Sequence, residues 1–175
     1  GETAEPNRHR RPHRQPATGG GARQAWRGLL DSPPLRIRER PPMSQTFHGS
    51  CLCGALHYRL SSPPRALSHC HCGQCRKAHG AAFASYGSVP VADLHIDRGA
   101  DLLAAFRSSP AVLRRFCSRC GSPLFWSRSE GEFADWVSVA LGSLNTPFPA
   151  AKQKHVQVAS MACWCRIADD WPRFD

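Results

Sequence analysis

Long apolar runs are missing from this sequence. Runs such as Ala81 to Ala84 and Val137 to Leu141 fall far short of the roughly twenty apolar residues that a membrane-spanning helix needs. No continuous apolar block opens the chain, so we expect no secretory signal and a cytoplasmic location. A membrane is therefore not an expected partner.

Several catalytic signatures are also missing. The sequence has no glycine-rich phosphate loop, no G-x-S-x-G elbow and no H-E-x-x-H motif. These absences argue against phosphate-loop NTPases, hydrolases of the nucleophile-elbow type and zinc proteases of that signature. Helical periodicity is nearly absent as well, which indicates a chain built mainly of strands.

Acidic residues are scarce. The 175 residues contain 13 Asp plus Glu against 23 Lys plus Arg, which gives a net charge of +10. Half of this excess belongs to residues 1–42, which hold nine Arg, four acids, seven Pro, five Gly and no Cys. A segment of this composition buries too little apolar surface to offset the entropy that is lost on ordering. Residues 1–42 are therefore predicted to be a disordered tail.

Two origins are open for this tail. It would act as a basic arm that recruits nucleic acid or an acidic surface, if it is a functional segment. Alternatively it is a non-native upstream extension, because translated GC-rich non-coding DNA has the same bias and Met43 stands just before the first patterned segment. A transit peptide is disfavoured, since seven prolines interrupt any amphipathic helix. Residues 43–175 are then expected to form a single zinc-binding domain.

The nine cysteines carry the main signal. All follow Met43, in four groups spaced C-x-C, C-x-C-x2-C, C-x2-C and C-x-C. A reducing compartment and the strain of bridging C-x-C neighbours disfavour disulfides, so zinc thiolates are the better interpretation. A glycine follows two of the groups, where a positive φ would turn backbone N–H groups towards the sulfurs. We predict one closed structural zinc site from these two groups, Cys51, Cys53, Cys117 and Cys120.

A second group has three cysteines, Cys70, Cys72 and Cys75, within six residues. Three protein ligands and one exchangeable position are typical of a catalytic zinc, so two zinc ions are expected in all. A closed site is the alternative, and the candidates for its fourth ligand are His69, His71, His79 and Cys165. An iron–sulfur cluster needs four ligands and would also have to borrow one from elsewhere in the chain.

Metal binding changes the net charge. With seven thiolates and two zinc ions, the charge of residues 43–175 falls from +5 to about +2, so nucleic acid is not an expected partner.

The remaining pattern predicts an all-β fold of short antiparallel strands with one short helix, stapled by zinc. We expect the helix over 73–79 and strands over 55–60, 66–70, 83–89, 94–97, 102–107, 112–116, 123–127, 136–141 and 155–160. His95 and His155 are expected at ordinary strand positions. The core is expected to contain the aromatic residues Phe83, Tyr86, Phe116, Phe125, Trp126 and Trp136.

Four motifs in order resemble a known family. They are Gly49-Ser50-Cys51-Leu52-Cys53-Gly54-Ala55, the stretch Cys70 to Lys77, Phe106-Arg107-Ser108-Ser109-Pro110, and Phe116 to Leu124. Together they look like the glutathione-dependent formaldehyde-activating enzyme family, which includes centromere protein V, over residues 46–174. The resemblance implies a beta-tent zinc-knuckle fold with four structural cysteines and three cysteines at the active site. It also implies a carbon–sulfur lyase that adds the thiol of glutathione to formaldehyde, giving S-hydroxymethylglutathione.

One segment departs from the family pattern. The chain has Cys163-Trp164-Cys165, whereas relatives usually place Pro before this Trp and a polar or acidic residue after it. On a strand both cysteines would face away from the indole, and we interpret them as inert buried thiols. Alternatively, Cys165 closes the second zinc site.

Two functional hypotheses follow. In the first, a small thiol such as glutathione fills the open position of the three-cysteine site, loses its proton and adds to formaldehyde or a related small aldehyde. His71 or His79 would move the proton, and Arg114 or Arg115 would hold a substrate carboxylate. In the second, the protein is a non-catalytic, zinc-stabilised module that binds nucleic acid or a protein through its basic N-terminal arm.

Overall fold

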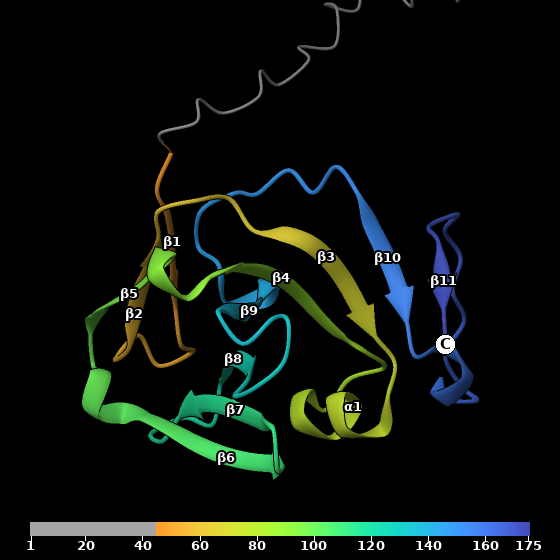
Figure 1. Cartoon of the computed structure of the whole chain (residues 1–175), viewed down its shortest axis with the longest axis horizontal. Helices are drawn as coiled ribbons and strands as arrows, with labels where there is room; N and C mark the ends of the chain where they lie inside the picture. Colours follow the sequence, from red (N-terminus) through yellow and green to blue (C-terminus); the bar gives the residue numbers. More distant parts are fainter. Residues whose placement is uncertain (1–44) are drawn as a thin grey trace, which may run out of the picture. The chain divides into compact units, whose positions relative to one another are not determined.

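Two β-sheets and one α-helix make up the part of the chain that the computed structural model describes, residues 45–175 (Figure 1). The expected tail, residues 1–42, lies outside the described residues. In spatial order, the smaller sheet contains β1 (Phe47–Ser50), β2 (His57–Leu60) and β5 (Leu94–Arg98). The larger sheet contains β11 (Arg173–Phe174), β10 (Gln153–Val156), β3 (Arg65–Cys70), β4 (Ala84–Pro90), β9 (Trp136–Ala140), β8 (Pro123–Arg128), β7 (Val112–Cys117) and β6 (Leu103–Ser109). Short 3-10 turns span Val91–Asp93, Ala100–Leu102, Leu141–Ser143 and Val158–Ser160.

The helix α1 spans Gly73–His79, as expected. Its N-cap is Cys72, whose backbone is extended and whose Sγ accepts the N–H of Cys75 at 3.4 Å. Gly80 ends the helix in the left-handed conformation, which costs glycine little. This cap places two cysteines of the three-cysteine group at the start of α1, directly after β3.

The all-β prediction is confirmed, but the strand directions and the C-terminal part need correction. Strand β10 pairs in parallel with both β3 and β11, so the larger sheet is mixed rather than antiparallel. β10 also ends at Val156, because Gln157 has a φ of 60° and a 3-10 turn follows. Cys163 and Cys165 lie in a turn, closed by a bond from the Cys165 N–H to the Ala162 oxygen at 2.9 Å. The expectation of two buried thiols on a strand is therefore wrong, and Cys163 is exposed.

The main core lies between the two sheets. Tyr58 of β2 is fully buried, and its ring meets Phe125 of β8 edge-on with centroids 5.0 Å apart. A large apolar side chain buried in this way contributes about 1.5–3 kcal/mol. The core brings the loop after β1 against the end of β7. Its largest members are Phe47, Leu56, Tyr58, Leu60, Leu124, Val89 and Val139.

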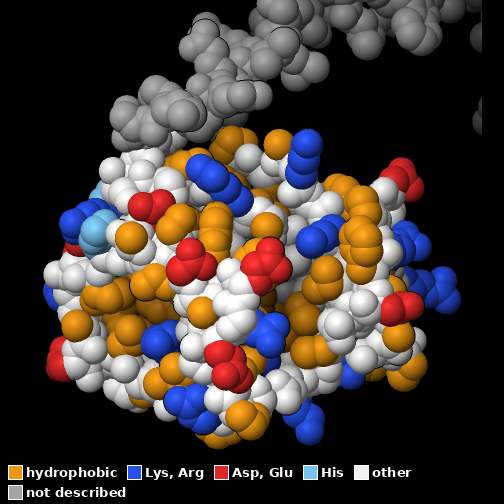
Figure 2. Space-filling model, viewed as in Figure 1, with side chains coloured by type: hydrophobic (Ala, Val, Ile, Leu, Met, Phe, Trp, Pro, Cys, Tyr) orange, Lys and Arg blue, Asp and Glu red, His pale blue; other side chains and the backbone are white. Residues whose placement is uncertain are grey.

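The surface carries no single block of charge on the face shown in Figure 2, where acidic and basic side chains are interspersed. No helix within residues 45–175 has the length and apolar character needed to cross a membrane.

Candidate metal centres and active-site cavity

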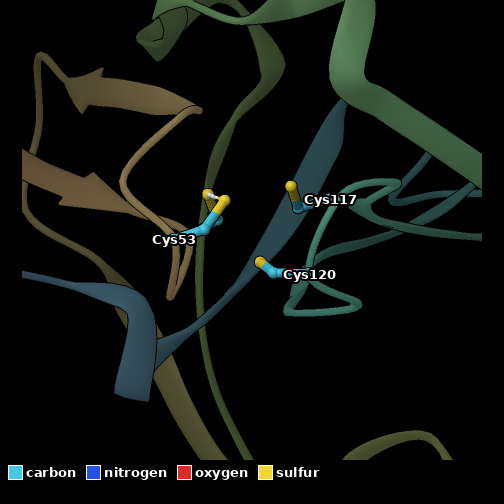
Figure 3. A group of neighbouring side chains, drawn as sticks. Cys53, Cys117 and Cys120 are labelled. Carbon is cyan, nitrogen blue, oxygen red and sulfur yellow. Dashed lines mark hydrogen bonds between the residues drawn. The ribbon is translucent and has the colours of Figure 1, made fainter.

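Four cysteines meet where the two sheets join. Cys51 and Cys53 lie in the loop after β1, Cys117 ends β7 and Cys120 lies in the turn before β8 (Figure 3). Their sulfur atoms all lie within 4.8 Å of one another, and those of Cys51 and Cys53 are 3.5 Å apart. The cluster therefore joins the loop after β1 of the smaller sheet to the end of β7 in the larger sheet.

Two glycine turns shape these loops. Gly54 has a φ of 67° and donates its N–H to the Cys51 oxygen, while Gly121 has a φ of 75° and donates to the Cys117 oxygen. An L-residue with a side chain is strained at such a φ, which explains glycine at both positions. The turns leave a further backbone N–H, that of Leu56, free to donate to the Cys51 Sγ at 3.3 Å.

The donor set fits zinc. Four thiolates at about 2.3 Å from one ion in a tetrahedron lie about 3.8 Å from each other, a separation that fits sulfur atoms all within 4.8 Å, with Cys51 and Cys53 3.5 Å apart. Hydrogen bonds from Ser122, first through its hydroxyl at 3.2 Å and then through its N–H, lower the pKa of Cys120 to about 5. This thiol is thus ready to bind as a thiolate, the form that zinc requires.

Three further cysteines meet at the junction of β3 and α1. The sulfur atoms of Cys70, Cys72 and Cys75 lie within 4.8 Å of one another, and no other His, Cys, Asp or Glu of residues 45–175 joins the group. A hydrogen bond with Cys70, and then the nearby Arg114, lower the pKa of Cys75 to about 6. The same bond raises the pKa of Cys70, so one thiolate shares a proton with a neighbouring thiol.

The four candidates for a closing ligand lie elsewhere. His69 bonds to Ser85 and Gln153, His71 bonds to His155, and His79 bonds to Tyr86. Cys165 does not join the group either. Within the described residues the site therefore offers three ligands and an open side.

The open side faces a cavity of about 290 Å³. Arg114 of β7 reaches into it, and its Nη1 and Nη2 lie 3.7 and 3.8 Å from the Cys75 Sγ. Bonds to Ser108 and Gln74, at 3.1 and 3.3 Å, hold the guanidinium in place. Besides the three cysteines, the cavity is lined by Ser68, Gln74, Tyr86, Val112, Arg114, Trp126, Ser138 and Val156.

The four residues proposed for catalysis do not all reach this cavity. Arg115 points to the other side of β7, where it donates to the Ser127 hydroxyl at 2.8 Å, because neighbouring strand residues face opposite ways. His71 is fully buried behind the cysteines, away from the cavity. His79 lines a neighbouring cavity of about 530 Å³ and bonds through Nε2 to the Tyr86 hydroxyl at 2.8 Å. Of the four, Arg114 alone lines the cavity.

A buried histidine cluster behind the site was missed by the sequence analysis. His155 was expected at an ordinary strand position, but its Nδ1 lies 2.8 Å from Nε2 of His71 and its Nε2 lies 3.2 Å from the Asp169 carboxylate. Trp171 stacks on His69 with ring centroids 5.1 Å apart. Residues 155 to 171 thus hold the segment that carries the three cysteines, and no local pattern predicts this contact, because it depends on the parallel pairing of β10 with β3.

Four of the six aromatic residues expected in the core are not fully buried. Tyr86 and Phe125 are buried as expected, whereas Phe83, Phe116, Trp126 and Trp136 are half-buried. Phe83, Trp126 and Trp136 line cavities. Their apolar rings form walls that a ligand can contact.

Fold and site together define a small β-sheet protein with two groups of cysteines able to hold metal ions. The sequence profile of the family described as glutathione-dependent formaldehyde-activating enzyme matches residues 46–166. The chain belongs to this family.

The chain is also similar to individual proteins. A Halomonas elongata protein, provisionally named a glutathione-dependent formaldehyde-activating enzyme, is 36% identical over 129 residues, covering 69% of this chain and 80% of its own. A Schizosaccharomyces pombe protein named an uncharacterized lyase is 27% identical over 106 residues, covering 59% and 75%. A crystal structure of a Rhodobacter sphaeroides protein matches with a TM-score of 0.48 and 25% identity, covering 58% of this chain and 91% of that one.

Proposed function

We propose that this protein is a carbon–sulfur lyase that reversibly adds the thiol of glutathione to formaldehyde beside Cys70, Cys72 and Cys75. The observation that carries the proposal is the open three-thiol group facing a cavity of about 290 Å³. The names of the relatives, formaldehyde activation and lyase, point to the same chemistry. None of the nine cysteines, all of which lie in residues 45–175, forms a disulfide, which suits a reducing compartment, and we place the protein in the cytoplasm.

The reaction needs one deprotonation and one protonation. The thiol gives its proton to solvent water, the sulfur electron pair bonds to the carbonyl carbon, and the carbon–oxygen π pair moves to oxygen, which takes up a proton. A zinc ion held by the three cysteines would supply the positive charge that lowers the pKa of a thiol to neutral pH. The other two tasks, holding the substrate and returning the proton, fall to side chains of the cavity.

Arg114 is suited to hold a carboxylate of the thiol substrate. Its guanidinium is fixed by Ser108 and Gln74, so little side-chain entropy is lost when it binds a ligand. It also lies against Cys75, next to the position at which the sulfur of the substrate would bind. A carboxylate bound there would orient the thiol over the cysteines.

Tyr86 is suited to return the proton. Burial raises the pKa of its phenol, so the hydroxyl stays protonated at neutral pH and can donate to the new alkoxide. His79 bonds through Nε2 to the same hydroxyl, and burial lowers the pKa of this histidine, so it is neutral. It can relay a proton to Tyr86 by giving one from Nε2 while Nδ1 takes one up. The pair connects the three-cysteine cavity with the cavity on the far side of Tyr86, where His79 lies.

The test uses NMR at chemical equilibrium to measure the exchange between glutathione and its hydroxymethyl adduct. The exchange rate before the protein is added gives the uncatalysed reaction in the same sample. The wild-type protein should accelerate exchange, and Cys72→Ser should abolish the effect. Arg114→Met should lower kcat/KM about 10- to 100-fold, because a hydrogen bond to a charged group is worth about 1.5–3 kcal/mol. Arg115→Met is the matched control and should leave the rate unchanged, since Arg115 faces the other side of β7. Full acceleration by Cys72→Ser would rule the proposal out.

Tyr86→Phe tests the proton donor separately. It should lower kcat about 100-fold with little change in KM, the lower end of the effect expected for a lost general acid. An unchanged kcat would remove Tyr86 from the mechanism without affecting the role of the cysteines.

A further inference from the structure

A second cavity, of about 380 Å³, lies on the same face of the large sheet and shares two wall residues, Trp126 and Ser138, with the three-cysteine cavity. The strand register connects the two. Directly paired residues run across β7, β8, β9, β4 and β3, and side chains at such positions point to one face of a sheet. This row is Arg114, Trp126, Ser138, Ser88 and Arg65. The row leads from Arg114, which lies beside Cys75, to Arg65 in the second cavity.

The second cavity is basic and aromatic. Arg65, Arg128 and Lys154 stand exposed around it, and no acidic residue lines it. None of the three is paired with a carboxylate in residues 45–175, where the two ion pairs involve other side chains. Lys154 instead lies 5.5 Å from the centre of the Phe174 ring. Trp126, Trp136 and Phe133 supply apolar surface between these cations.

The backbone beside Arg65 is strained. Ala66 has a φ of 49°, which a residue with a side chain rarely adopts, and the register of β3 against β4 shifts between Arg65 and Ser68. This irregularity lets Arg65 pair with Ser88, whose side chain lines the same cavity. Strain of this kind is concentrated at binding sites, where the surroundings hold it.

We propose that this second cavity is the subsite for the anionic end of the thiol substrate. The proposal rests on the function proposed for the three cysteines and narrows its substrate to elongated thiols that carry a remote carboxylate. Arg65 and Cys70 stand at the two ends of β3, which would be about 16 Å apart if the strand were fully extended. The irregularity at Ala66 and the long cationic side chains shorten this distance. The substrate carboxylate would therefore lie on the order of 10 Å from the substrate sulfur. Glutathione, with a carboxylate at each end, belongs to this class, and small neutral thiols do not.

The test measures binding of S-methylglutathione to the full chain by isothermal titration calorimetry. This probe keeps both carboxylates but has no thiol, so its binding is independent of the proposed reaction. Arg128→Gln and Lys154→Gln should each weaken binding about threefold and the double variant about tenfold, because each substitution removes one partly solvated charge contact to the carboxylate. Added salt should also lower the affinity of the wild-type protein for the probe, because it screens these charges. Lys152→Gln is the matched control, since Lys152 is also exposed and lies two residues before Lys154 but does not line the cavity.

Kinetics supply a second readout. With glutathione the double variant should raise KM about tenfold at unchanged kcat, and with 2-mercaptoethanol neither constant should change. The subsite is refuted if S-methylglutathione does not bind, or if the double variant binds it as tightly as Lys152→Gln does. A protein that binds the probe through these cations but accelerates no thiol addition would refute the proposed reaction and keep the subsite.

Discussion

Gly49 tests what positions the four-cysteine cluster. It lies in β1, two residues before Cys51, and pairs directly with Tyr58 of β2. A Cβ at this position would lie 2.6 Å from the Tyr58 Cε1 and closer still to Cζ and Oη. The ring cannot turn away, because Tyr58 is fully buried and its hydroxyl bonds to that of Ser143 at 2.6 Å. Gly49→Ala must therefore push β1 and its cysteine loop away from β2.

The expected cost follows from these contacts. Carbon atoms pack at about 3.5–4.0 Å, so the strands must separate by roughly 1 Å. Overpacking of this kind costs about 1–3 kcal/mol, and losing the Tyr58–Ser143 bond adds about 1 kcal/mol. We expect a loss of about 3 kcal/mol in the free energy of unfolding, which for a domain of this size lowers the Tm by about 10 °C.

The assay is thermal unfolding followed by circular dichroism, with zinc content measured on the same samples. Gly142→Ala is the matched control, because a Cβ there meets nothing within 4 Å, and its Tm should stay within about 2 °C of the wild type. Tyr58→Leu lacks the ring atoms that clash, so combined with Gly49→Ala it should cost less than the sum of the single changes. If Gly49→Ala melts together with Gly142→Ala, packing against Tyr58 does not position the cluster.

Three further predictions concern the metal sites and the buried histidines. The wild-type protein should contain two zinc ions per chain by mass spectrometry, Cys70→Ser should contain one, and the exposed-thiol control Cys163→Ser should keep both; one ion in the wild type would contradict a second site. Cys117→Ser should leave the protein largely unfolded at 25 °C. A structural zinc contributes about 10–16 kcal/mol of apparent folding free energy, whereas the total stability of a domain is about 5–15 kcal/mol. An intact melting transition would show that the cluster is dispensable. Burial lowers the pKa of His69, so the unfolded chain binds more protons there and stability is lost as the pH falls below about 6.5, by up to about 1.4 kcal/mol per pH unit. Urea unfolding between pH 7.5 and 5.5 with excess zinc should therefore show a shallower slope for His69→Gln than for the wild type, and equal slopes would exclude His69 as a contributor.

The local features of this protein were determined by the sequence alone. The helix at Gly73–His79 was predictable, because Cys72 and Gly80 cap it and the interactions involved span only a few residues. Spacing also predicts which neighbouring cysteines act together, since ligands two or three residues apart can point to one site, but the contact of Cys51 and Cys53 with Cys117 and Cys120 depends on the tertiary structure. Most strands were predictable within one or two residues, because their alternation depends on one buried face.

The tertiary structure decided which of the candidates face the cavity. Arg114 and Arg115 are equivalent in sequence, and the register of β7 alone turns the first towards Cys75 and the second towards Ser127. His155 joins His71 across 84 residues through a parallel strand pair that no local pattern encodes. The second cavity likewise brings together side chains of five strands. Long-range strand order, which arises from packing of the whole chain rather than from any segment of it, decides each of these placements.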